Sequence, residues 1–117
     1  MSKRVLAELT DLVLRFRDER DWKQFHNPKE LAISLVVESA ELLELMQWQQ
    51  GEALEQALRK KREPIIDELA DVLHSLLLLA HDLDVDLDAA LRQKLAKAAV
   101  KYPIEKSRGK AKKYTDL

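Results

Sequence analysis

The sequence has no cysteine and, among its 117 residues, only two glycines and three prolines. Without cysteine, the chain can form neither a disulfide nor a zinc–thiolate site, and it lacks a cysteine nucleophile. The scarcity of glycine and proline, together with abundant Leu, Ala, Glu, Lys and Gln, favours helices over strands. A chain of this length suits a single domain with a useful core. The sequence therefore predicts an all-α protein.

An excess of charge of one sign is also lacking. The chain carries 20 Lys and Arg against 21 Asp and Glu, a formal net charge of −1. Such a balance gives no overall attraction to nucleic acid or to an anionic membrane. Residues 1–21 contain no apolar signal core, and the longest apolar run, Leu76–Ala80, is too short to cross a bilayer. We expect a cytoplasmic protein that binds neither a nucleic-acid polymer nor a membrane.

Hydrophobic spacing predicts five helices, over residues 2–20, 28–50, 52–61, 64–83 and 87–101. Asn27 can cap the second helix, Pro28 fits its first position, and Gly51 supplies its stop. Asp86 can cap the last helix, and Pro103 prevents its continuation.

The end of the chain is a basic tail, with positive charges at Lys106, Arg108, Lys110, Lys112 and Lys113. A tail of this kind is usually mobile, although it could also fold over a polyanionic ligand. We predict one helical domain over residues 1–103, followed by this tail over residues 104–117.

The apolar residues predict which side chains are buried. The helix over residues 64–83 is apolar almost all round, which is typical of burial between neighbours. Three positions of the last helix are expected to face inward: Leu91, Leu95 and Ala98. Trp22 and Phe25 precede the second helix, where they either close the end of a bundle or line a pocket for a flat ligand.

Two of these helices carry acidic residues where a core helix would normally be apolar. Glu38 and Glu41 lie three residues apart, so their side chains project from one helix face. Glu68 and Asp71 repeat this arrangement in a second apolar segment. Buried carboxylates are costly unless they are paired or bind a metal. Since Mg²⁺ and Mn²⁺ prefer oxygen ligands, the two pairs form a candidate site for a hard divalent cation.

A site of this kind suits phosphoryl or nucleotidyl hydrolysis. The metal would neutralise phosphate charge and lower the pKa of a bound water, and a carboxylate free of metal could accept that water's proton. From spacing alone, however, ion pairs with Arg and Lys of adjacent helices explain the four acids more simply.

The acidic pairs also resemble the signature of a known family. Glu38-x-x-Glu41, followed after 26 residues by Glu68-x-x-Asp71, is similar to the motif of the MazG-like, all-α nucleoside triphosphate pyrophosphohydrolases. A more local likeness is to the branch that includes the dCTP pyrophosphatases. It is carried by residues 25–31, 38–44, 47–48, 67–73 and 101–103 with the following Gly109. The likeness runs from about Trp22 to the C-terminus.

This resemblance implies a four-to-five-helix bundle that assembles as a homodimer or a dimer of dimers. Such proteins cleave a nucleoside triphosphate between its α- and β-phosphates, releasing the monophosphate and pyrophosphate. The implied substrate is a deoxynucleoside triphosphate, with dCTP or modified pyrimidine nucleotides as candidates in nucleotide-pool cleaning.

The resemblance also assigns roles by position. The catalytic acids, which would hold Mg²⁺ or Mn²⁺ in its place, are Glu38, Glu41, Glu68 and Asp71. The residues expected near the base and sugar are His26, Trp48 and Trp22. Those expected to approach the phosphates are Lys94, Lys101 and Tyr102, and the basic tail could close over them.

Two positions depart from the family pattern. Ala98 stands where the family usually has Asn, three residues before the Lys-Tyr-Pro segment. Ser75 stands where a Tyr commonly follows the motif's Asp by four residues. Both changes bear on substrate choice, because neither touches the metal acids.

Two other functions remain open from the residues alone. One is a helical interaction module in which the acids only form ion pairs. The other is a di-iron carboxylate bundle, since Asp71-x-x-His74 resembles half of such a site.

Overall fold

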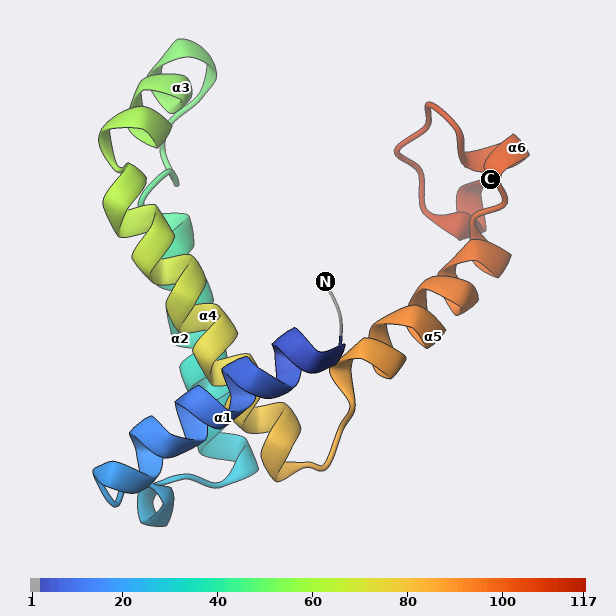
Figure 1. Cartoon of the computed structure of the whole chain (residues 1–117). Coiled ribbons are helices and arrows are strands. Elements are labelled where there is room, and N and C mark those ends of the chain that lie inside the picture. The colour runs from blue at the N-terminus through green and yellow to red at the C-terminus, as the bar shows by residue number, and fades with distance from the viewer. Residues whose placement is uncertain (1–2) are drawn as a thin grey trace. The chain divides into compact units, whose positions relative to one another are not determined.

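The computed structural model describes residues 3–117 and is helical along the described chain (Figure 1). It contains no strand within these residues, so the predicted all-α class is confirmed. The elements are α1 (Lys3–Glu19), η1 (Lys23–Phe25), α2 (Pro28–Glu44), α3 (Gly51–Lys60), α4 (Arg62–Asp82), α5 (Leu87–Lys101), α6 (Ile104–Ser107) and η2 (Tyr114–Asp116), where η denotes a short 3₁₀ helix. None of the described helices is long and apolar enough to cross a membrane.

The chain divides into two compact units, one ending at Asp84 and the other running from Val85 to Leu117. The first unit contains α1 to α4, and the second contains α5, α6 and η2. The division into a domain over residues 1–103 and a tail stays a prediction.

In the first unit, α2 and α4 pack side by side, and α1 lies against α4 (Figure 1). The buried apolar residues of this unit are Leu31, Ala57, Leu77, Leu78 and Ala80. Most of them belong to the C-terminal half of α4. The pairing of α2 with α4 matters for function, because these are the helices that carry the two acidic pairs.

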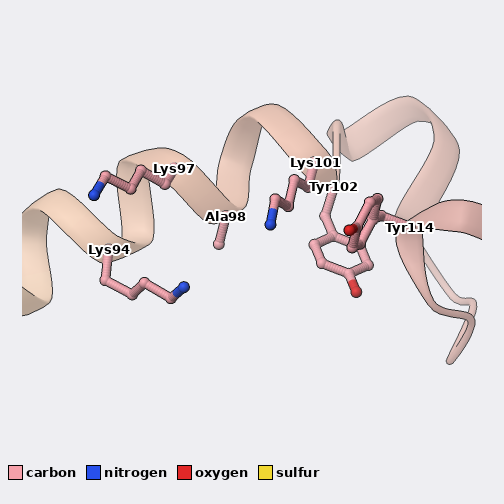
Figure 2. Close-up of a pocket in the computed structure, with 6 residues that line it drawn as sticks. All are labelled: Lys94, Lys97, Ala98, Lys101, Tyr102 and Tyr114. Atoms are coloured by element: carbon pink, nitrogen blue, oxygen red, sulfur yellow. The ribbon is translucent and has the colours of Figure 1, made fainter.

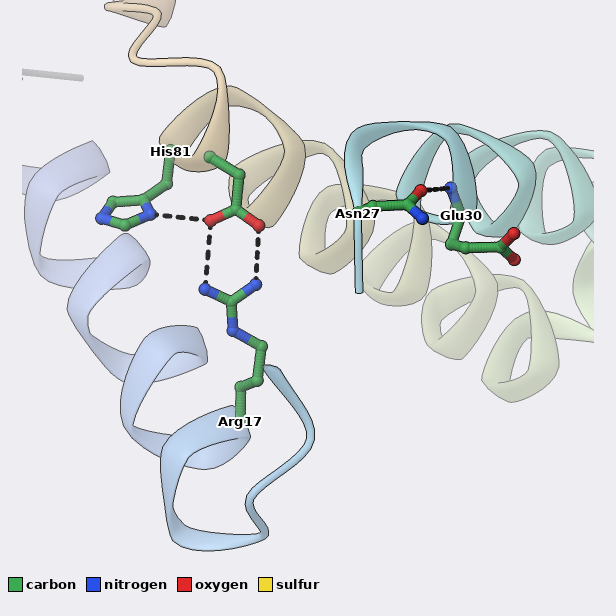
Figure 3. A network of polar contacts seen from close by, with 5 residues as sticks. Arg17, Asn27, Glu30 and His81 are labelled. Carbon is green, nitrogen blue, oxygen red and sulfur yellow. Dashed lines mark hydrogen bonds and ion pairs between the residues drawn. The ribbon is translucent and has the colours of Figure 1, made fainter. Parts of the chain in front are cut away.

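An ion pair fastens α1 to α4 (Figure 3). Both terminal nitrogens of Arg17 donate to the carboxylate of Asp82, at 2.8 and 3.1 Å, and the Arg17 side chain is only 2% exposed. The Nδ1 atom of His81 lies 3.0 Å from the same carboxylate. The hydrogen bonds from Arg17 are the main cause that lowers the pKa of Asp82 to about 2.

Local signals determine how α2 and α5 begin. The Oδ1 atom of Asn27 accepts a hydrogen bond of 2.8 Å from the backbone N–H of Glu30 (Figure 3), which confirms the predicted cap. Asp86 caps α5 in the same way, through the N–H of Ala89 at 3.1 Å. The helix bounds predicted for α5 are also confirmed.

The predicted end of α2 is wrong. The helix stops at Glu44, and residues 45–48 form turns instead of continuing to residue 50. The ammonium group of Lys61 donates to the carbonyl of Leu45 at 3.1 Å, which satisfies a carbonyl at this helix end. Gly51 does not end α2, since it opens α3 with a φ of +56°.

Two predictions of burial are also wrong within the described chain. On α4, three large apolar side chains are 39–52% exposed: Ile66, Leu69 and Leu73. On α5, Leu91 and Leu95 are 61% and 60% exposed. The reason is a lack of neighbours. Only the short α6 and η2 accompany α5 in its unit, and α1 and α2 do not surround α4 along its length.

Candidate carboxylate and phosphate sites

The packing of α2 against α4 brings three predicted acids together. Glu38 and Glu41 project from successive turns of α2, and Glu68 faces them from α4. One carboxylate oxygen from each lies within 4.8 Å of the others. Asp71, one turn beyond Glu68, is exposed and does not belong to this group of three. The close group therefore consists of carboxylates from two helices, and their role as metal ligands stays a prediction.

No cation pairs with these acids within the described residues. Ion pairs among the described side chains involve other carboxylates, among them those of Glu8, Glu19, Asp82 and Asp88. In addition, the Oε2 atoms of Glu38 and Glu68 are buried without a hydrogen-bond partner. This contradicts the interpretation of the acids as ion pairs. Buried, unpaired carboxylate oxygens are costly, and an oxygen-ligated divalent cation would satisfy them.

The crowding of the acids changes the protonation of Glu38. The pKa of Glu38 is raised to about 7. The largest cause is Glu68, with which a protonated Glu38 can share a hydrogen bond. Burial and the neighbouring Glu41 act in the same direction, and the charge of Asp71 adds to them. At neutral pH, close to this pKa, a large fraction of the molecules thus carry a proton on Glu38, and an arriving cation would displace it.

The residues expected near a base lie before the start of α2. The His26 ring is half-buried, and its Nδ1 atom is buried without a partner. Burial, and then the charge of Arg17, lower the His26 pKa and so favour the neutral imidazole. Trp22 packs edge-on against Phe16, with centroids 5.9 Å apart, and is 45% exposed. An exposed aromatic ring and a neutral imidazole are suited to contacts with a flat, polar ligand.

Trp48 lies at the other end of α2 and is 86% exposed. A helix of 17 residues is roughly 25 Å long, so α2 separates this tryptophan from Trp22 and His26. Within one chain, the structure does not bring these three residues together. The acidic cluster lies between the two ends of the helix.

The second unit contains a basic pocket (Figure 2). Three of its residues were expected to approach phosphates: Lys94, Lys101 and Tyr102. Two further lining residues, Lys97 and Tyr114, were not among the predicted site residues. Lys97 could have been found, because it lies three and four residues from the other lysines on one helix face. Tyr114 carries no local signal, since its position depends on how the tail folds.

The pocket lies in a strongly basic part of the chain. Residues 85–117 carry nine Lys and Arg against four Asp and Glu, a formal charge of +5, which leaves −6 for residues 1–84. Ala98 presents its methyl group in the pocket, at the position where the family usually has Asn. A basic pocket with phenol groups can bind an anion through charge and through hydroxyl donors.

The residues next to the acidic cluster do not support a di-iron site. Within residues 3–117, the side chains close enough to share a metal ion are three glutamates and no histidine. His74 instead contacts Phe16 edge to face, with ring centroids 5.8 Å apart. Ser75, the other departure from the family pattern, is buried in α4.

The chain is similar to known proteins in both sequence and structure. Residues 33–117 match the model of the MazG-like family. The chain is 44% identical over 114 residues to dCTP pyrophosphatase 1 of Rattus norvegicus and 40% identical to that of Homo sapiens, covering 96% of this chain and 67% of either relative. Its structure resembles a pyrophosphatase from Archaeoglobus fulgidus, with a TM-score of 0.78 and 39% identity over 83% of this chain and 91% of the other.

Proposed function

This chain belongs to the MazG-like family, and on that basis we propose that it is a nucleoside triphosphate pyrophosphohydrolase. The reaction is hydrolysis between the α- and β-phosphates, which yields a nucleoside monophosphate and pyrophosphate. The names of the dCTP pyrophosphatase relatives support a deoxycytidine or modified pyrimidine triphosphate as the substrate. The proposed role is removal of such nucleotides from the cytoplasmic pool.

The carboxylate cluster is the observation that carries this proposal. Its oxygens converge from two helices, and two of them are buried without a partner. We propose that Glu38, Glu41 and Glu68 hold Mg²⁺, or Mn²⁺ in its place, and that Asp71 completes the set. When bound, such an ion neutralises phosphate charge and activates water.

The other residues would bind and orient the nucleotide. If Asp71 instead stays free of metal, its carboxylate would accept a proton from the attacking water. Lys94 and Lys101 would offset phosphate charge, and Tyr102 can donate a hydrogen bond from its hydroxyl. His26, Trp22 and Trp48 remain the candidates for contacts with base and sugar.

We also propose that the active form is a homodimer or homotetramer. Trp48 and His26 lie at opposite ends of α2, so they can contact one nucleotide only if different subunits provide them. An interface between subunits would also cover the apolar side chains that this chain leaves exposed on α4 and α5.

A panel of deoxynucleoside triphosphates tests the activity. Each is incubated with the full chain and Mg²⁺, and the products are separated by anion-exchange chromatography. The expected products are the monophosphate and pyrophosphate in equal amounts, with the fastest turnover for a pyrimidine nucleotide. Release of orthophosphate with a diphosphate, or no release above background, would reject the proposal. A Mg²⁺-dependent rise in melting temperature is expected as well, whereas a purely structural helical module should show none.

A further inference from the structure

The strongest unexplained feature is the way the end of the chain returns to α5. Gly109, with a φ of +74°, lies in the turn after α6, and the chain then leads to η2. As a result, Tyr114 lines the same pocket of about 180 Å³ as three lysines of α5 and Tyr102 (Figure 2). The tail therefore contributes an aromatic wall to a pocket whose other side is a helix.

The lysines of this pocket are electrostatically unsatisfied. Lys94, Lys97 and Lys101 project from successive turns of α5 and form no ion pair with any described carboxylate. Like charges three and four residues apart on a helix repel one another. An anion with two or more charges would relieve this repulsion, which points to a di- or triphosphate group as the ligand.

Tyr114 contacts the two groups best placed to bind such an anion. The Nζ atom of Lys101 lies 4.8 Å from the centroid of the Tyr114 ring, within the range of a cation–π interaction. The ring of Tyr102 meets the Tyr114 ring edge to face, with centroids 5.9 Å apart and an interplanar angle of 86°. Figure 2 shows the two tyrosines overlapping beside the Lys101 ammonium group.

These contacts restrict side chains that would otherwise be mobile. A lysine side chain has four rotatable bonds and loses much conformational freedom when its ammonium group binds a ligand. A ring that already holds the ammonium group reduces that loss, and the edge-to-face contact fixes the plane of the neighbouring phenol. The pocket is thus partly organised before the anion arrives.

We infer that Tyr114 is a positioning residue that organises Lys101 and Tyr102 to bind the di- or triphosphate group of the substrate. The inference rests on the proposed function for the identity of the substrate, but the pocket, the ring contacts and the charges are independent of it. The aromatic ring of Tyr114 performs this role, and the hydroxyl group is dispensable.

The test measures binding of inorganic pyrophosphate to the full chain by calorimetry, at low salt and with EDTA so that the carboxylate cluster takes no part. Tyr114→Leu should weaken binding by between about threefold and tenfold, the size expected for one cation–π contact with its ordering effect. Tyr114→Phe, which keeps the ring, should bind within about twofold of the unchanged chain on the same scale. Thr115→Ala is the matched control and should bind like the unchanged chain.

A double-mutant cycle separates positioning from a general effect on the fold. If Tyr114 acts through Lys101, Tyr114→Leu should have a smaller effect in a Lys101→Ala background than alone. In hydrolysis assays, Tyr114→Leu should raise KM and leave kcat nearly unchanged.

Several results would overturn the inference. They are no pyrophosphate binding by the unchanged chain, equal losses for Tyr114→Leu and Tyr114→Phe, or additive losses in the cycle. Binding that depends on Tyr114 in a chain that hydrolyses no nucleotide would keep the inference and reject the proposed function. Nucleotide hydrolysis with an unchanged KM in Tyr114→Leu would keep the proposed function and reject the inference.

Discussion

The side chain of Glu38 projects from α2 towards α4, and one of its carboxylate oxygens is buried without a hydrogen-bond partner. Two other glutamates contribute oxygens within 4.8 Å, so the charged forms of all three repel one another. No neighbouring Arg or Lys within the described residues compensates for this repulsion. Carboxylates that repel one another and have no counter-charge are expected at functional sites, where a bound ligand supplies the missing positive charge.

The raised pKa of Glu38 predicts how stability depends on pH without metal. The folded protein binds this proton more tightly than the unfolded chain, whose pKa is near 4.5. The stabilising contribution is therefore fully present below about pH 4.5 and is lost as the pH rises through about 7. Urea denaturation in EDTA should show a larger loss of unfolding free energy between pH 5 and 8 for the unchanged chain than for Glu38→Gln.

A matched variant controls for removal of an acid from α2. Glu44→Gln changes an exposed residue of the same helix outside the cluster, so its pH dependence should follow that of the unchanged chain. Identical slopes for Glu38→Gln and Glu44→Gln would show that the cluster does not raise this pKa.

The buried ion pair between α1 and α4 provides a prediction about stability. Arg17→Met leaves the carboxylate of Asp82 without its main partner, and breaking a buried pair in this way costs about 3–5 kcal/mol. Arg4→Met is the control, because Arg4 forms an exposed pair with Glu8 and should change stability by no more than about 1 kcal/mol. Equal losses in chemical denaturation would contradict a special role for the buried pair.

At the scale of helices, the ends that depend on residues close by in the sequence were predicted well. Asp86 and Pro103 bracket α5, and both act on the backbone next to them. The end of α2 could not be predicted, because it involves Lys61, a residue 16 positions away that donates to the Leu45 carbonyl. The burial of α5 was misjudged for a related reason, since periodicity shows which face is apolar and not whether another element covers it.

The cap of α2 has a measurable energy. Asn27→Ala removes the acceptor for the Glu30 N–H and should lower the unfolding free energy by about 0.5–2 kcal/mol. Asn27→Asp keeps an oxygen acceptor in place and should preserve most of the stability. If both variants were as stable as the unchanged chain, the hydrogen bond would contribute nothing to the helix.

At the scale of the whole chain, the sequence identified the acids and the helices that carry them, but not the full pocket. The spacing of Glu38, Glu41 and Glu68 predicted which side chains share a helix face, because helix geometry determines this. The expectation of a metal site came from the resemblance to the MazG-like family, since from spacing alone ion pairs were the simpler explanation. Tyr114 could not be predicted, because its contact with Tyr102 depends on the path of the tail after Gly109. The separation of Asp71 from the other acids could not be predicted either, since spacing does not tell which of the four lie within 4.8 Å of one another.

The exposed apolar surface predicts self-association. Val36, Leu43 and Leu69 of α2 and α4 are 52–68% exposed, which is unusual for so many large side chains in a stable monomer. Sedimentation velocity at about 10 µM should find a dimer or a tetramer. Leu69→Glu should shift the distribution towards smaller species. A monomer at that concentration would contradict the proposed assembly.

The carboxylate cluster between α2 and α4 is the proposed catalytic centre. The most direct test is the rate of pyrophosphate release from the preferred nucleotide, in Mg²⁺, for Glu41→Gln and Glu68→Gln with Glu44→Gln as the control. Loss of a residue that only supports a metal ligand typically costs 10- to 100-fold in activity, so loss of either acid should cost at least about 100-fold. The control should keep nearly full activity. Full activity in Glu41→Gln and Glu68→Gln would show that the cluster is not the catalytic centre.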